Sequence, residues 1–494
     1  MSIVWAVFVS LVVVLGASTA ARAGGHASHV PADVDVFMTL REARLEDWTF
    51  LSGLAGSGAE ATAAWEELGA VLGLEKREAF EALAGRRASV AVRGAWARSA
   101  EWVVLLTLEE ASAERFRRAF KARPRKIVAG RPVLALEGGE YLAAVMRHED
   151  AVVLALARSG FGDASLFEAV CADGGARLSE TEAGCGLEEL RGARYAAVVR
   201  LPWEQGWLAA GTKALGPETL VRVVGRLSEA CEGGVSIEPR AWSEAFDGAL
   251  FAAVERTGSL VELQRKEGAD GTLALIAPLL EALMPAGGGG AALVIREDAE
   301  AGLAIGAALT AASPVERAAE LDAAASRTLG RLGQAMGQGA WEHDFLGLFP
   351  RATRRASFPN GFEIAWAYAG APEAGGGVGW LAASTSDDLL GALHRSATRQ
   401  ASERFPEVDE ALGERGEWRS VGAARPAALL RVLRGQGAEP PAAMGGLARV
   451  ELVEWTLRDF PGGRLEGEVL MRRAEAGESA RESARESARP RRRE

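Results

Sequence analysis

The feature that most constrains the fold is a similarity between two distant parts of the chain. The run from Arg87 to Arg93 is similar to the run from Gly290 to Arg296, and each is followed by a second apolar run and a helix-like segment. Short runs rich in Val, Ile and Leu that end in turn residues are typical of β-strands. We therefore predict a hairpin followed by a helix in each half. In the second half, Ser313 and Pro314 predict the helix start.

The later blocks keep the same order in both halves. A strand-like run that ends at serine precedes a helical run in each, and a further strand then leads to a proline that can occupy the first turn of a helix. The matched pairs are residues 153–159 with 378–384, 166–170 with 389–393, and 194–201 with 419–425. This order predicts an internal duplication. The alternative is chance similarity in a chain rich in Ala, Gly and Leu.

Each half is expected to end in a hairpin, formed by residues 249–255 with 260–266 and by 450–457 with 464–471. A strand at Val34 to Leu40 and the helical stretches after it, up to Leu83, are expected as an addition to the first half alone. Strands joined by short turns favour antiparallel sheets over parallel ones. We predict an α+β protein of two related lobes, residues 24–275 and 276–474, each a mainly antiparallel sheet with helices packed on one face.

The first 23 residues resemble a secretory signal peptide. An apolar run from Ile3 to Ala17 precedes Ala21-Arg22-Ala23, which has the pattern of a cleavage site. No Lys or Arg precedes the apolar run, so an uncleaved anchor is the alternative. No later segment approaches the roughly 20 apolar residues of a membrane span. We expect an exported protein, periplasmic or extracellular, with no transmembrane span once the signal is removed.

The net charge of the chain argues against nucleic acid as a partner. The 494 residues carry a formal net charge of -11, which argues against binding nucleic acid.

Residues 475–494 repeat Glu-Ser-Ala-Arg and have a run of arginines near their end. This stretch has little apolar surface to bury, so we predict a disordered charged tail.

The three cysteines are Cys171, Cys185 and Cys231. In an oxidising compartment we expect Cys171 and Cys185 to form a disulfide across the polar loop between them, worth about 3 kcal/mol in the chain-entropy description. Three free thiols are the alternative. Three cysteines are too few for a structural zinc site of the usual kind.

Cleavage after Ala23 would leave Gly24-Gly25-His26 at the mature N-terminus. The free amine, two backbone amides and the His26 imidazole could then hold Cu(II) or Ni(II) in a square plane, with His29 as an axial ligand. The alternative is a flexible leader that binds no metal. The other histidines are expected in a turn, in a charged loop and at a helix end, respectively His148, His343 and His394. Trp203 and Trp207 are predicted on one helix face.

No phosphate loop, nucleophile elbow, zinc-protease helix or calcium loop is found in the sequence. The opening from Val30 to Phe37, the strand-to-helix steps that end at Ser159 and Ser384, and the run from Gly463 to Gly467 together resemble an uncharacterised family of exported bacterial proteins that begin with a Pro-Ala-Asp strand. That family has no established activity, so the resemblance implies export and architecture alone.

These observations favour a non-enzymatic exported binding or scaffold protein. Paired lobes could hold a hydrophobic ligand or lipid in a cleft, or could present a surface to an envelope partner. A structural or assembly protein of the envelope and a hydrolase without a recognisable motif are the alternatives.

Overall fold

The computed structural model describes residues 26–473 except for 42–44, 46–65, 67–68, 71–72, 85–86, 96–100, 120–123, 129–130, 137–140, 149–150, 159–164, 173, 191, 202–205, 214, 216, 228–236, 258–278, 280–281, 284–288, 299–301, 313, 315, 336–340, 346–352, 359–360, 370–377, 403–416 and 438–446. The chain divides into two compact units after Leu227. The N-terminal unit holds the described residues up to 227, with 447–450 and 468–473. The C-terminal unit holds those from 237 to 437, with 451–467.

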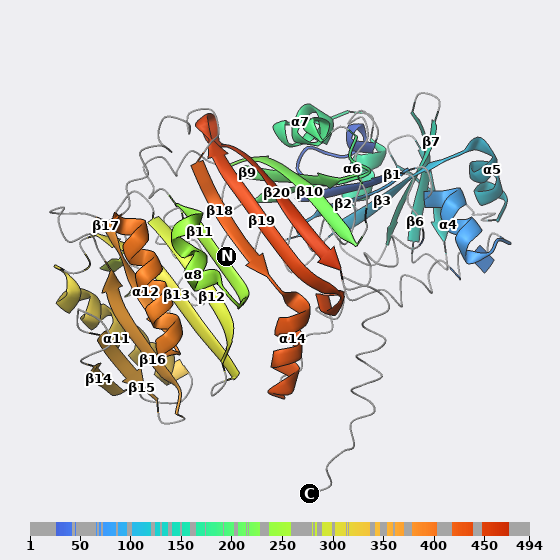
Figure 1. Ribbon diagram of the computed structural model, residues 1–494. Helices are drawn as coiled ribbons and strands as arrows, with labels where there is room; N and C mark the ends of the chain where they lie inside the picture. Colours follow the sequence, from blue (N-terminus) through green and yellow to red (C-terminus); the bar gives the residue numbers. More distant parts are fainter. Residues whose placement is uncertain are drawn as a thin grey trace, which may run out of the picture. The chain divides into compact units, whose positions relative to one another are not determined.

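In its described part, the N-terminal unit contains ten strands, four α-helices and two short 3-10 helices. Figure 1 colours these elements by their position in the sequence. In chain order they are η1 (His26–Ser28), β1 (Val36–Arg41), α4 (Lys76–Ala84), β2 (Arg87–Arg93), β3 (Glu101–Leu108), α5 (Glu110–Ala119), β4 (Pro124–Val128), β5 (Arg131–Leu136), β6 (Tyr141–His148), β7 (Ala151–Arg158), α6 (Ser165–Cys171), η3 (Leu178–Glu180), α7 (Glu182–Glu189), β8 (Tyr195–Leu201), β9 (Gly206–Thr212) and β10 (Glu218–Arg226).

These strands pair in the order β4-β5-β6-β7-β3-β2-β1-β8-β9-β10, and every described register is antiparallel. Consecutive strands form most of the pairs, whereas β3 with β7 and β1 with β8 join strands distant in the chain, and β1 is a central strand between β2 and β8. Neighbouring strands in an antiparallel sheet need no helical crossover, which agrees with the short connections in the sequence.

The C-terminal unit contains, in chain order, η4 (Pro239–Trp242), α8 (Ser243–Phe246), β11 (Ala249–Thr257), β12 (Gly289–Asp298), β13 (Gly302–Ala312), α11 (Ala318–Ala335), β14 (Trp341–Phe345), β15 (Thr353–Ser357), β16 (Glu363–Ala369), β17 (Val378–Ser384), α12 (Asp387–Ser402), β18 (Glu417–Ala424), α14 (Pro426–Gly435), β19 (Val450–Phe460), η6 (Pro461–Gly463) and β20 (Arg464–Arg473). The unit boundary assigns β20 to the C-terminal unit up to Gly467.

The strand order of this unit is β14-β15-β16-β17-β13-β12-β11-β18-β19-β20. It repeats the order of the N-terminal unit strand for strand, with β11 in the place of β1 and β18 in the place of β8. One backbone hydrogen bond marks the same register in both: the Arg200 N–H donates to Asp35 O and the Arg425 N–H donates to Leu250 O, each at 2.7 Å.

Helices cover both faces of each sheet, whereas the sequence predicted helices on one face. Along β16, the alternating residues Ala365 and Ala367 join a buried cluster with Leu389 and Leu393 of α12. Trp366 and Tyr368, which point to the opposite face, pack in a second cluster with residues of α11. In the N-terminal unit, Phe80 of α4 likewise packs in a different cluster from Phe167 of α6. The long apolar runs fit strands that are buried on both faces.

The first unit ends earlier than the sequence predicted. The expected boundary lies between residues 275 and 276, but β11 pairs with β12 on one side and with β18 on the other, so it belongs to the C-terminal unit. The first unit closes with β9 and β10 instead. Strand β1 is correspondingly no addition to the first half, because β11 holds the same central position in the second.

Two local predictions also change. Trp207 lies in strand β9 and not on a helix, since Trp207 to Thr212 pairs residue by residue with β8. Helix α11 begins at Ala318, later than the predicted start at Ser313, which lies outside the described residues. After β18, a helix does begin at Pro426 as predicted.

Candidate functional site: a charged pocket in the C-terminal unit

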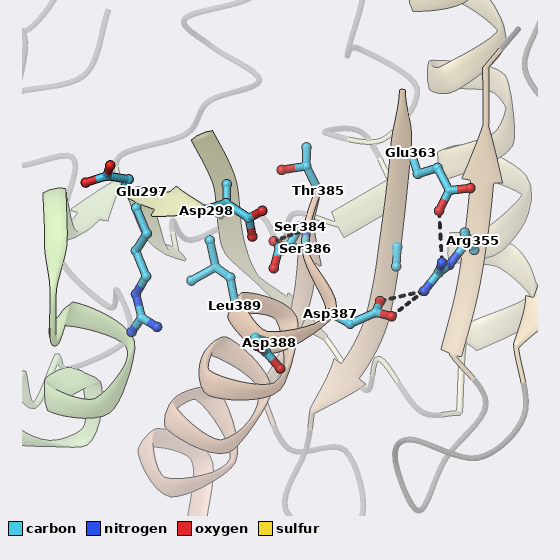
Figure 2. Close-up of a pocket in the computed structure, with 13 residues that line it drawn as sticks. Glu297, Asp298, Arg355, Glu363, Ser384, Thr385, Ser386, Asp387, Asp388 and Leu389 are labelled. Atoms are coloured by element: carbon cyan, nitrogen blue, oxygen red, sulfur yellow. Dashed lines mark hydrogen bonds and ion pairs between the residues drawn. The ribbon is translucent and has the colours of Figure 1, made fainter. Parts of the chain in front are cut away.

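A pocket of about 620 Å³ lies at the N-terminal end of α12 (Figure 2). Its lining comes from β12, β13, β15 and β16 and from the segment that joins β17 to α12. The lining residues are Arg296, Glu297, Asp298, Ala304, Arg355, Glu363, Ala365, Ser384, Thr385, Ser386, Asp387, Asp388 and Leu389. The volume falls in the range of small-molecule sites.

The step from β17 to α12 is fixed by hydroxyl groups. Ser384, which ends β17 and is buried, accepts a hydrogen bond from the Ser386 N–H at 3.1 Å and donates to Ile305 O at 3.2 Å. The Thr385 hydroxyl accepts from the Ile305 N–H at 2.9 Å. These bonds hold the segment that leads into α12 against β13. Short hydroxyl side chains are suited to this role because they bond to nearby backbone groups.

Arg355 of β15 joins two carboxylates of the pocket lining. It donates to Glu363 of β16 at 2.9 Å and to both oxygens of Asp387 at 2.5 and 2.6 Å (Figure 2). Burial acts to lower the pKa of the Arg355 guanidinium, but hydrogen bonds and attraction to Asp387 and Glu363 outweigh it and raise the pKa. The guanidinium therefore stays charged, and its charge is balanced within the pocket wall.

Arg296, at the end of β12, is held by the neighbouring helix α8. Its Nη2 donates to the carbonyl oxygens of Glu244 and Ala245 at 2.6 and 2.8 Å. The Glu244 carboxylate in turn binds Arg395 and Arg399 of α12, at 2.6 and 3.3 Å. This second guanidinium of the pocket is thus directed at backbone carbonyls of α8.

The pocket carries an excess of negative charge. Its lining has five acidic side chains and two basic ones, and both guanidiniums are already engaged. Glu297 and Asp388 are exposed, and neither has an ion-pair partner among the described residues. Asp387 and Asp388 lie in the first turn of α12, where the helix dipole stabilises carboxylates. The arrangement is suited to holding a positively charged group.

The structure describes one residue of the predicted metal site, His26. His26 is buried, and its Nδ1 and Nε2 lie 2.7 Å from Ser89 Oγ and from Thr107 Oγ1. Both ring nitrogens therefore lie within hydrogen-bond distance of hydroxyl oxygens, and copper or nickel binding at a cleaved N-terminus stays a prediction. Gly24 and Gly25 lie outside the described residues. In the described part of the chain, no three His, Cys, Asp or Glu side chains are grouped to hold a metal ion.

The predicted disulfide is not present in the structure. Cys171 and Cys185 are not joined to each other. Cys171 is buried in the core that α6 forms with the sheet, whereas Cys185 is on the exposed side of α7. The two thiols thus face different surroundings. Cys231 lies outside the described residues.

The other histidines do not gather at the pocket. His148 is in β6 and His343 is in β14 and not in a loop. His394 is inside α12, where its Nε2 lies 3.2 Å from Tyr368 O. Trp203, the tail from 475 and the hairpin partner at 260–266 lie outside the described residues. None of the described helices combines the length and the apolar character needed to cross a membrane.

Sequence reasoning missed the pocket because its lining is scattered over about 90 residues of chain in separate elements. The usable signal was the run Ser384-Thr385-Ser386-Asp387-Asp388, which has the composition of a polar helix start. No protein-family model, curated protein or solved structure matches the chain.

Proposed function

We propose that this protein is an exported, non-enzymatic binding protein built by internal duplication, and that its ligand site is the charged pocket at the start of α12. The observation that carries the proposal is the pocket itself, about 620 Å³ in volume and lined by five acidic and two basic side chains. Export rests on the apolar run before Ala23 and on the resemblance to exported bacterial proteins.

The duplication is supported by the order of the strands. The ten described strands of each unit pair in the same order, and the Arg200 and Arg425 N–H bonds mark equivalent positions. The sequence similarity between Arg87–Arg93 and Gly290–Arg296 falls on equivalent strands, β2 and β12. Independent origin of the same ten-strand order within one chain would be a far rarer event.

The chemistry of the pocket favours a charged small molecule over the hydrophobic ligand expected from the sequence. A lipid chain would bring apolar surface against Glu297, Asp387 and Asp388, and it would remove water from carboxylates without replacing their interactions. A polar ligand can instead complete the charge pattern. The proposed class of function, binding of a ligand outside the cell, is unchanged.

Native mass spectrometry of the protein purified from its own cell envelope tests the proposal. We expect a small-molecule adduct on the wild type that is lost in the double variant Glu297→Lys/Asp388→Lys. The matched control is Glu451→Lys/Glu454→Lys, which reverses two exposed charges on β19 in the same unit and should keep the adduct. A protein without an adduct, or an adduct that both double variants retain, contradicts the proposal.

A further inference from the structure

The two units allow the pocket to be compared with its counterpart in the same chain. Strand registers define the equivalent positions: if Val36 corresponds to Phe251, then their partners Val92 and Ile295 correspond, and so do Arg93 and Arg296. On the next strand, the partners of these arginines, Glu101 and Ala304, are therefore equivalent. In helices α6 and α12, buried Leu166 and Phe167 correspond to buried Leu389 and Leu390. Ser165 is therefore equivalent to Asp388.

In the N-terminal unit, the chain's own side chains fill this region. Nη1 of Arg93 donates to Ser165 Oγ at 3.2 Å, and Nη2 pairs with Asp33 at 3.0 Å. The Ser165 hydroxyl donates to Glu101, which also accepts from the Leu166 N–H at 2.8 Å. A guanidinium therefore sits against the first residue of α6, with carboxylates on either side of it.

In the C-terminal unit, three changes open the same region. Ala304 replaces Glu101, so the carboxylate that fills the space is gone. Arg296, equivalent to Arg93, is directed at the carbonyls of Glu244 and Ala245. Asp388 replaces Ser165, so a full negative charge stands where the hydroxyl receives a guanidinium in the other unit. The pocket thus combines an added anionic acceptor with a cation that is turned elsewhere.

We infer that the ligand carries a guanidinium or primary ammonium group, which binds Asp388 in the place that the Arg93 guanidinium takes in the N-terminal unit. This inference rests on the proposed function and specifies the chemical class of its ligand. Glu297 adds negative potential to the lining, and Arg355 does not compete because Glu363 and Asp387 hold it. The pocket volume leaves room for a molecule larger than the charged group alone.

Calorimetry on the full chain with one charged probe and one neutral isostere tests the inference. Butylguanidinium and butylurea share size and planar shape but differ in charge. A charge-assisted hydrogen bond to a carboxylate predicts that butylguanidinium binds roughly tenfold tighter or more. Asp388→Asn should remove most of that difference, and Asp388→Glu should restore part of it. Asp247→Asn, an exposed change in the same unit, should leave it intact.

The outcomes separate this inference from the proposed function. Equal binding of the two probes, no binding of butylguanidinium at millimolar concentration, or an unchanged preference in Asp388→Asn overturns the inference. The proposed function then still stands if the envelope-derived adduct persists and remains sensitive to Glu297→Lys/Asp388→Lys. Thermal unfolding of each variant shows whether a loss of binding comes from a loss of folding, and Asp388→Glu supplies the folded comparison.

Discussion

At the scale of single residues, Asp322 of α11 connects the helix to the sheet. Its carboxylate accepts hydrogen bonds from Tyr368 Oη at 2.5 Å, from Trp366 Nε1 at 3.0 Å and from Arg354 Nε at 2.9 Å. Burial, followed by the hydrogen bond to Asp322, raises the pKa of the Tyr368 phenol, so the phenol remains a donor. One acceptor therefore satisfies three donors from two adjacent strands, β15 and β16.

Asp322→Ala should destabilise the C-terminal unit by about 3 kcal/mol, because three donors at a partly buried site lose their acceptor. Asp322→Asn, which keeps one carbonyl oxygen, should cost about 1 kcal/mol. The control is Glu320→Gln, two residues away, whose exposed ion pair with Arg317 should contribute far less to stability. Urea unfolding measures all three. Equal losses for Asp322→Ala and Glu320→Gln would show that the cluster does not hold α11.

At the scale of elements, Glu244 links α8 to α12 through ion pairs with Arg395 and Arg399. A hydrogen bond from Arg395, opposed by burial and aided by attraction to Arg395, Arg399 and Arg296, lowers the pKa of Glu244. A carboxylate whose pKa is lowered by folding stabilises the folded state above its unfolded pKa, near 4.3 for glutamate. That contribution is lost as the pH falls through the lower, folded pKa.

Glu244→Gln should therefore be less stable than wild type at pH 7, and the difference should shrink as the pH falls below about 4. Denaturant unfolding across pH 3 to 7 measures it. Glu454→Gln, on the exposed face of β19, should show no such convergence. A constant difference between wild type and Glu244→Gln at all pH values would mean that the link between α8 and α12 does not depend on the charge of Glu244.

The same scale shows what the sequence could predict. Arg87–Arg93 and Gly290–Arg296 are in the correct register, and so are Arg194 and Arg419, because the hydrophobic alternation of these central strands is retained. The predicted match of residues 153–159 with 378–384 is displaced by two residues. The pairing of β7 with β3 and of β17 with β13 makes Leu156 equivalent to Ala383. A shift of two keeps each side chain on the same face, so the pattern alone could not detect it.

Strand β1 and strand β11 show where the pattern carries too little information. Arg41 of β1 and Arg256 of β11 are at equivalent positions, but the apolar residues before them differ, and Glu255 stands where β1 has Leu40. Their equivalence is set by their partners on each side. The pocket could not be predicted for a related reason: Arg355 and Asp387 are 32 residues apart, and each alone reads as an ordinary surface charge.

At the scale of the whole molecule, the position of β11 decides which segments can fold together. Strand β11 lies between β12 and β18, and Val254 at its centre is fully buried. The boundary expected from the sequence, between residues 275 and 276, would leave both of these neighbours with an open edge. The observed division after Leu227 keeps β11 within its own sheet.

A fragment of residues 228–473 should therefore unfold cooperatively in urea and show the circular dichroism of an α+β protein, whereas residues 276–473 should not. Removing a central strand exposes two rows of backbone groups and divides the core, which a domain of this size cannot offset. Hydrogen exchange on the full chain gives an independent readout: the amides of β11 should exchange together with those of β12 and β18. If β11 instead exchanges with β10, or if both fragments unfold with equal cooperativity, β11 does not organise the C-terminal sheet and the ten-strand unit is not the folding unit.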